Sequence, residues 1–181
     1  MKKTTKGKKT LPKIEIGSYH AGGIVFYIDE TSEHGLVMAP IQGNKENSDL
    51  LDYYEVEEVE WGPMGLDVPG TFTDLGYGLS NTDLILAATP GIKTAASVCR
   101  DLKLNGYNDW FLPSVGELRL LHDELFDSDW YCMDGGSYWS SNQDYPFHAF
   151  EFSLGCEFYE EGDCRTFHKN EACYVLPIRS F

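Results

Sequence analysis

The clearest pattern along the chain is a run of apolar residues at helical spacing between residues 112 and 125. The stripe consists of Val115, Leu118, Leu121 and Leu125, which fall on one face of a helix. Ser114 precedes the stripe and Glu117 follows it by three residues, which is the spacing of a capping box. The pattern therefore predicts a helix that starts after Ser114 and packs on a sheet. Three of its residues lie off the centre of the stripe and are expected to reach solvent: Arg119, His122 and Asp123.

Two segments before this helix carry shorter helical patterns. Asn81 or Thr82 is expected to cap a helix that runs to Ala88. Thr89 and Pro90 are typical of the N-cap and first residue of another helix. The buried stripe expected of that helix consists of Ile92, Ala95, Ala96, Cys99 and Leu102.

Apolar runs near the start of the chain predict a hairpin. Residues 22–29 are apolar on both faces, which favours a central strand. Residues 36–39 follow after a turn and are expected to pair with them. The long segment 44–75 is predicted to be irregular, with an acidic patch and scattered proline and glycine.

Three further strands are predicted in the second half of the chain. Residues 138–141 are expected to form a core strand with Trp139 buried, and residues 150–154 a half-buried strand with Glu151 outward. Residues 173–178 form the last predicted strand. Its end is expected at an edge or a bulge, because Pro177 has no N–H to donate.

The charge of the chain is strongly divided along its length. The 181 residues carry a net charge of -15, yet six of the 14 basic residues lie within residues 1–13, where there is no acidic residue. These lysines are Lys2, Lys3, Lys6, Lys8, Lys9 and Lys13. The acidic body is expected to repel nucleic acid and anionic membranes. The lysine arm is expected to bind other copies of the chain or an acidic subunit of an assembly.

Two features of the sequence bear on localisation. No apolar run has the length of a membrane span, so no membrane insertion is expected. The basic N-terminus is not followed by an apolar stretch, so no signal peptide is expected in this chain.

The chain is predicted to consist of an arm (residues 1–19) and one domain (residues 20–181). The domain has enough residues for a sizeable core.

Short blocks along the domain carry a resemblance to a known family. Residues 109–114 read Asp-Trp-Phe-Leu-Pro-Ser and are followed by Glu117-Leu118. The other blocks are residues 22–27, residues 35–37, Trp61-Gly62, Asn81-Thr82, Tyr138-Trp139-Ser140-Ser141 and the ending 177–181. Together they resemble a bacterial family of unknown function that includes the C-terminal domain of the Legionella collagen-like protein. The fold of that family is similar to those of C-type lectins and of formylglycine-generating enzymes.

The resemblance implies a fold and a class of function. The expected fold is α+β and C-type-lectin-like, with two helices packed on a twisted antiparallel sheet and long irregular loops. In that fold residues 23–28 and 174–178 are expected to be paired neighbours in one sheet. The expected function is non-enzymatic recognition or adhesion on a cell or virus-particle surface, by loops that bind a glycan or a protein receptor. The alternatives are a structural subunit of a larger particle, tethered by the lysine arm, and an oxidase like the formylglycine-generating enzymes.

Candidate ligand-binding residues lie on two loops of the second half. They are Asp144, Tyr145, Phe147 and His148, with Glu160 and Asp163 on a segment that is interpreted as an insertion relative to the family. Aromatic side chains with polar neighbours often anchor binding sites. The alternative is that the aromatics pack inward and the acidic residues are solvated.

No cofactor is expected, although two sets of residues have the ligand types of a metal site. Cys156, Cys164, His168 and Cys173 have the ligand types of a zinc site, but not its usual paired spacing. A Cys156–Cys164 disulfide and unlinked thiols are the alternatives. Asp123, Glu124, Asp127, Asp129 and Asp134 are hard ligands for calcium, and a solvated acidic loop is the alternative. The five histidines are scattered along the chain, so the sequence alone indicates no histidine pair.

Overall fold

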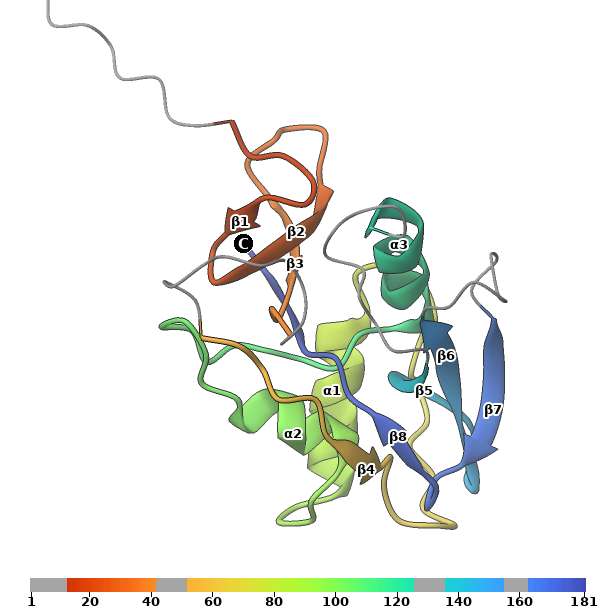
Figure 1. The fold of residues 1–181 in the computed structure, drawn as a ribbon. Helices are drawn as coiled ribbons and strands as arrows, with labels where there is room; N and C mark the ends of the chain where they lie inside the picture. The colour runs from red at the N-terminus through yellow and green to blue at the C-terminus, as the bar shows by residue number, and fades with distance from the viewer. Residues whose placement is uncertain (1–12, 42–51, 126–135, 155–162) are drawn as a thin grey trace, which may run out of the picture.

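The computed structural model describes residues 13–41, 52–125, 136–154 and 163–181 (Figure 1). Over these residues the fold is α+β, with three helices and two mostly antiparallel sheets. The helices are α1 (Gly78–Ala88), α2 (Ala95–Asp101) and α3 (Val115–Leu125). The strands are β1 (Tyr19–His20), β2 (Gly23–Ile28), β3 (Gly35–Met38), β4 (Glu58–Glu60), β5 (Gly136–Tyr145), β6 (His148–Leu154), β7 (Cys164–His168), β8 (Ala172–Tyr174) and β9 (Ile178–Ser180). None of the described helices is long and apolar enough to cross a membrane.

The two sheets divide the strands between an upper and a lower part of Figure 1. The four-stranded sheet has the order β1-β2-β3-β9, and the five-stranded sheet has the order β4-β8-β5-β6-β7. All pairs are antiparallel except β5 with β8. The predicted hairpin is confirmed, since β2 pairs with β3 and lies inside its sheet. Strand β4 lies within the segment that was predicted to be irregular.

The predicted pairing of the last strand with β2 is wrong. The segment is split, because β8 belongs to the five-stranded sheet while β9 pairs with β3 in the other sheet. Strand β3 therefore separates β9 from β2. Pro177 lies where the chain crosses between the sheets. It has no N–H to continue a ladder, and its carbonyl accepts a hydrogen bond from the Ala39 N–H at 2.9 Å.

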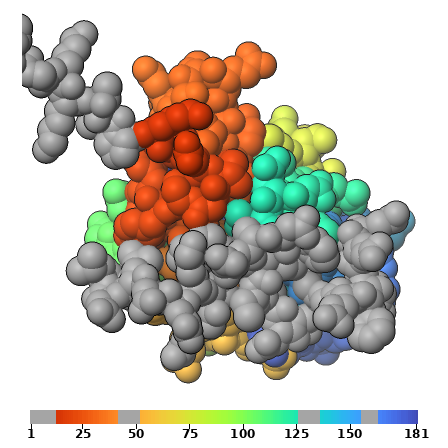
Figure 2. All heavy atoms as spheres, turned by 45° about the horizontal axis from the view of Figure 1, so that its top comes forward, coloured from red at the N-terminus to blue at the C-terminus, as the bar shows by residue number. Residues whose placement is uncertain are grey.

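Helix α3 matches its prediction and joins the two sheets. The Ser114 N–H donates to Glu117 Oε2 at 2.7 Å and the Glu117 N–H donates to Ser114 Oγ at 3.2 Å, which completes the capping box. The apolar stripe is buried against β2 of one sheet and β5 and β6 of the other. Figure 2 shows α3 beside the N-terminal strands on one face of the molecule.

His122 was expected to reach solvent, and this expectation is wrong. Its exposed fraction is only 3%, and its ring lies 6.0 Å from the ring of Phe152. His122 follows Val115 by seven residues, which is nearly two full turns, so it returns to the buried face. Glu151 was also expected to point outward, but it is fully buried in β6.

The boundaries of α1 and α2 differ from those predicted. Asn81 and Thr82 lie inside α1 and are buried, because their side chains hold neighbouring segments rather than the helix end. Asn81 Nδ2 donates to Ser141 Oγ at 3.0 Å, and Thr82 Oγ1 accepts from the Leu112 N–H at 3.0 Å. Long-range partners of this kind cannot be recognised from local spacing.

Helix α2 begins after Thr94, which forms a capping box with Ser97. Thr89 instead ends α1, where its hydroxyl donates to the Ile85 carbonyl at 2.7 Å. Ile92 therefore lies in the α1–α2 loop and is 45% exposed. The other predicted stripe residues, Ala95, Ala96 and Cys99, are buried, and Leu102 is half-buried.

Arg179 joins three distant parts of the domain. Its guanidinium donates to both carboxylate oxygens of Asp109, at 2.6 and 2.8 Å, and to the Ala21 carbonyl at 2.7 Å. It also lies over the Tyr107 ring, 3.9 Å from the centroid. The hydrogen bonds from Arg179 lower the pKa of Asp109, because they favour its ionised form. This clamp closes the four-stranded sheet onto the segment that leads into α3.

Candidate functional site

The β5–β6 turn presents two aromatic side chains to solvent. Tyr145 pairs with His148 across the turn, and Pro146 and Phe147 connect the strands. Tyr145 is 64% exposed and Phe147 is 52% exposed. Asp144 and His148 are partly buried beside them. The alternative in which both aromatics pack inward is therefore wrong.

The other two predicted ligand-binding residues do not join this group. Asp163 precedes β7, where it pairs with Arg165 at 2.6 Å and its carbonyl accepts from the Ser153 N–H. That position is at the end of β6 farthest from the β5–β6 turn. Glu160 lies outside the described residues, as do Lys2, Lys3, Lys6, Lys8 and Lys9 of the arm.

Beneath the turn lies a lysine that is completely buried. Lys169 Nζ donates to the Leu66 carbonyl at 2.7 Å and to Gln143 Oε1 at 2.5 Å, and it lies 4.4 Å from the centre of the Trp61 ring. Two acceptors and an aromatic face partly replace the water that the ammonium loses. Burial still lowers the pKa of Lys169 to about 8.

Gln143 connects this lysine to the 61–68 segment. Its Oε1 also accepts from the Val68 N–H at 2.8 Å, and its Nε2 donates to Asp67 Oδ1 at 2.5 Å. Lys169 and Gln143 thus fix the same segment from two sides. A side-chain amide can both accept and donate, which suits Gln143 to this bridging position.

Backbone hydrogen bonds hold the turn itself. The Gly65 N–H donates to the Pro146 carbonyl at 3.0 Å, and the Lys169 N–H donates to the Phe147 carbonyl at 3.0 Å. Gly65 has φ +80°, a left-handed conformation that favours glycine, and a Cβ there would lie in ordinary contact with the Phe147 ring, at 3.4 Å. The turn is therefore fastened on both sides, by the 61–68 segment and by the β7–β8 turn.

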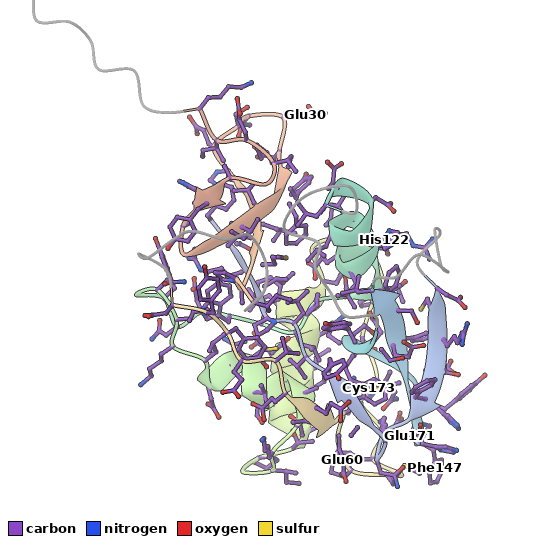
Figure 3. All side chains as sticks on the ribbon, in the orientation of Figure 1. Glu30, Glu60, His122, Phe147, Glu171 and Cys173 are labelled. Atoms are coloured by element: carbon purple, nitrogen blue, oxygen red, sulfur yellow. The ribbon has the colours of Figure 1, made fainter. Side chains whose placement is uncertain are left out.

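We name the group of side chains around the turn the tip surface and define it as the exposed Met64, Asp67, Tyr145 and Phe147 with the half-buried His148. Phe147 lies at the same end of the molecule as Glu60 and Glu171, far from Glu30 (Figure 3). Sequence reasoning found the two aromatics and missed Lys169 and Gln143. Lys169 stands in a polar turn between His168 and Asn170, so no local signal marks it as buried.

The metal sites weighed from the sequence are not assembled among the described residues, where no three His, Cys, Asp or Glu side chains could hold an ion together. Cys164 packs against the core that contains α3, whereas Cys173 belongs to the core around Trp61 and Trp139. Cys156, the fourth zinc candidate, lies outside the described residues. So do Asp127, Asp129 and Asp134 of the calcium candidates, while Asp123 and Glu124 are exposed on α3.

The described cysteines are free thiols in protective surroundings. Burial raises the pKa of Cys164 to about 11 and that of Cys173 to about 12, and it raises the pKa of Cys99 well above its usual value. Reactive cysteines need the opposite shift, because the thiolate is the nucleophile. The described thiols therefore give the oxidase hypothesis no support.

A cavity of about 750 Å³ lies on another part of the molecule, between α1, α2 and the segment around Tyr54. Charged groups at its edge neutralise each other, as Lys93 Nζ lies 2.6 Å from Glu57 Oε2. None of the ligand-binding residues predicted from the sequence lines it. The tip surface, with exposed aromatics on a fastened turn, is the stronger candidate.

Replacing Lys169 should destabilise the fold beneath the tip surface. We expect Lys169→Ala to lower the free energy of unfolding by about 2–4 kcal/mol, because the side-chain stem leaves a cavity, the Leu66 carbonyl loses its hydrogen bond from Nζ, and Gln143 Oε1 keeps only the Val68 N–H. The matched control is Lys103→Ala, an exposed lysine on which we expect an effect within about 0.5 kcal/mol. Chemical denaturation measures both, and equal effects would contradict the bracing role.

Lys169 should also make the stability of the fold depend on pH in a definite direction. The folded-state pKa of Lys169 is about 8, below the value of 10.5 for a free lysine, so between these values the unfolded chain binds more protons. Stability relative to Lys169→Met should therefore rise as the pH increases from 8 to 10.5. A relative loss of stability over that interval would show that the ammonium is favoured in the folded state.

Comparison with known proteins adds no identification. No family model matches the chain, and a search of curated proteins finds no significant match.

Proposed function

We propose that this chain is a non-enzymatic recognition domain that binds a glycan or protein receptor through the tip surface. The observation that carries the proposal is that Tyr145 and Phe147 are exposed on a turn fastened from below by a buried lysine. Contiguous apolar patches on a protein surface often mark sites of interaction with a partner. Binding is stronger when such anchors are already held in place, because less conformational freedom is lost.

The chemistry of the tip surface suits a ligand with both apolar and polar faces. Tyr145, Phe147 and Met64 offer apolar area, and the Asp67 carboxylate and the Tyr145 hydroxyl offer polar contacts beside it. Sugars and peptide segments both combine such faces. Aromatic residues of this kind supply much of the affinity in interfaces, because they bury large area at a small entropic cost.

The finer fold assignment is part of the same proposal. We propose a C-type-lectin-like fold, supported by the burial of Trp110, Phe111 and Trp139 from the resembling blocks. The Asp109–Arg179 clamp also joins two of those blocks. A third helix and a second sheet depart from the two-helix, one-sheet expectation. Display on a cell or virus-particle surface follows from the resemblance and belongs to the proposal.

The proposal is tested by removing the anchors. Tyr145→Ala with Phe147→Ala should weaken binding to any ligand found on a glycan array or a panel of cell-surface proteins at least tenfold, which is about 1.4 kcal/mol. Ile92→Ala is the control, since Ile92 is equally apolar and 45% exposed but lies in the α1–α2 loop. The two arms of the screen distinguish glycan from protein. Unchanged binding by the double variant would refute the role of the tip surface.

A second candidate function rests on the division of charge. The six lysines of residues 1–13 precede a body that holds all 29 acidic residues, so contacts between the arm and another acidic surface are favoured. Lys13 is exposed and lies 3.9 Å from Glu15, which is a weak contact that leaves it open to a partner. The chain would then be a structural subunit tethered by its arm.

Deleting residues 1–13 tests this tether. We expect the truncated chain to keep its melting temperature, because no described core residue is lost, and to assemble less at low salt. Each exposed ion pair contributes only about 0–1 kcal/mol and is screened by salt, so the difference should shrink at high salt. Light scattering measures the oligomer mass. Unchanged assembly at low salt would reject the tether.

A further inference from the structure

The structure brings together two histidines that are twenty residues apart in the sequence. His148 of β6 pairs directly with His168 of β7, and their ring centres lie 4.3 Å apart. Strand β7 is at the edge of the five-stranded sheet, and His168 is exposed. No other described pair of histidine rings is in contact.

The backbone pattern explains why the rings meet. The Lys169 N–H donates to the Phe147 carbonyl at 3.0 Å. Phe147 and Lys169 are therefore a hydrogen-bonded pair of the ladder, directly next to the pair of histidines. His148 and His168 therefore occupy the non-hydrogen-bonded type of position, where the Cα atoms of an antiparallel pair are closest, about 4.5 Å apart. Their side chains leave the sheet side by side on the same face.

Within the described part of the chain, the ring nitrogens of this pair have no hydrogen-bond partner. Neither imidazole forms a hydrogen bond within the described residues, and the one hydrogen bond from His168 to Glu171 comes from its backbone N–H, at 3.2 Å from Oε1. His122, in contrast, is buried within α3. The two rings can therefore each turn a nitrogen toward a shared ion.

We infer that His148 and His168 form a two-histidine chelating site for a divalent transition-metal ion. Neutral imidazole suits copper, nickel and zinc, whereas calcium and magnesium require oxygen ligands. Two protein ligands leave the remaining positions to water or to a donor from a bound molecule. The Glu171 carboxylate beside His168 and the net charge of -15 favour a cation at this place.

This site differs from the zinc set weighed from the sequence, which shared only His168 with it. It also stands apart from the recognition proposal, because metal binding by the pair requires no receptor. An ion held by both histidines would tie the edge strand β7 to β6 beside the β5–β6 turn. Binding to the folded state alone would raise the melting temperature.

The test uses the full chain and Ni²⁺, with His148→Gln and His168→Gln as variants. Calorimetry should show one ion per chain, with at least tenfold weaker binding in each variant, because one imidazole cannot chelate. His34→Gln is the matched control, since His34 is exposed on the β2–β3 turn and has no histidine partner among the described residues. It should bind as the unchanged chain does.

Two further readouts test where the ion binds and whether it stabilises the fold. Paramagnetic Ni²⁺ should broaden the backbone NMR signals of residues 147–149 and 167–169 first, and Ni²⁺ should raise the melting temperature of the unchanged chain but of neither histidine variant. No binding at millimolar Ni²⁺ would overturn the inference. So would binding that survives both substitutions, or broadening centred on another part of the chain.

Discussion

The tip surface depends on the burial of one ammonium group. Lys169 is withdrawn completely from water, and its charge is met by the Leu66 carbonyl, by Gln143 Oε1 and by the face of Trp61. Burying a charge is costly unless such partners are present, so all three must stay in place for the fold to keep the lysine there. The hydrogen bonds that the Lys169 ammonium requires therefore hold the loop that carries Leu66 and the strand that carries Gln143 in place.

The rest of the domain supplies a rigid base for this arrangement. Trp61 belongs to the core cluster around Trp139, and the Trp61 Nε1–H donates to the Ser140 carbonyl at 2.8 Å, which ties the start of the 61–68 segment to β5. Helix α3 then fixes the five-stranded sheet against the four-stranded one. Exposed aromatics on such a base lose little freedom when they bind, which distinguishes a binding surface from a mobile loop.

Local sequence signals predicted the elements whose structure is determined locally. The capping box of α3, the β2–β3 hairpin and the burial of Trp139 all follow from short spacings that the structure confirms. The errors concern residues whose partners are distant. Thr82 resembles a cap but accepts from Leu112, and the strand around Pro177 divides between two sheets. The brace at Lys169 and the contact of His148 with His168 are likewise set by tertiary packing, so no local pattern reveals them.

The central claim is that the β5–β6 turn is held rigidly, and amide hydrogen exchange tests it most directly. The Gly65 and Lys169 N–H groups donate to the carbonyls of Pro146 and Phe147, one on each side of the turn. If the turn is fastened, both amides should exchange as slowly as the amides of β5 and β6, because they open only with the sheet. Exchange at the rate of an unstructured peptide, while the sheet stays protected, would show that the aromatics stand on a mobile loop and would contradict this account.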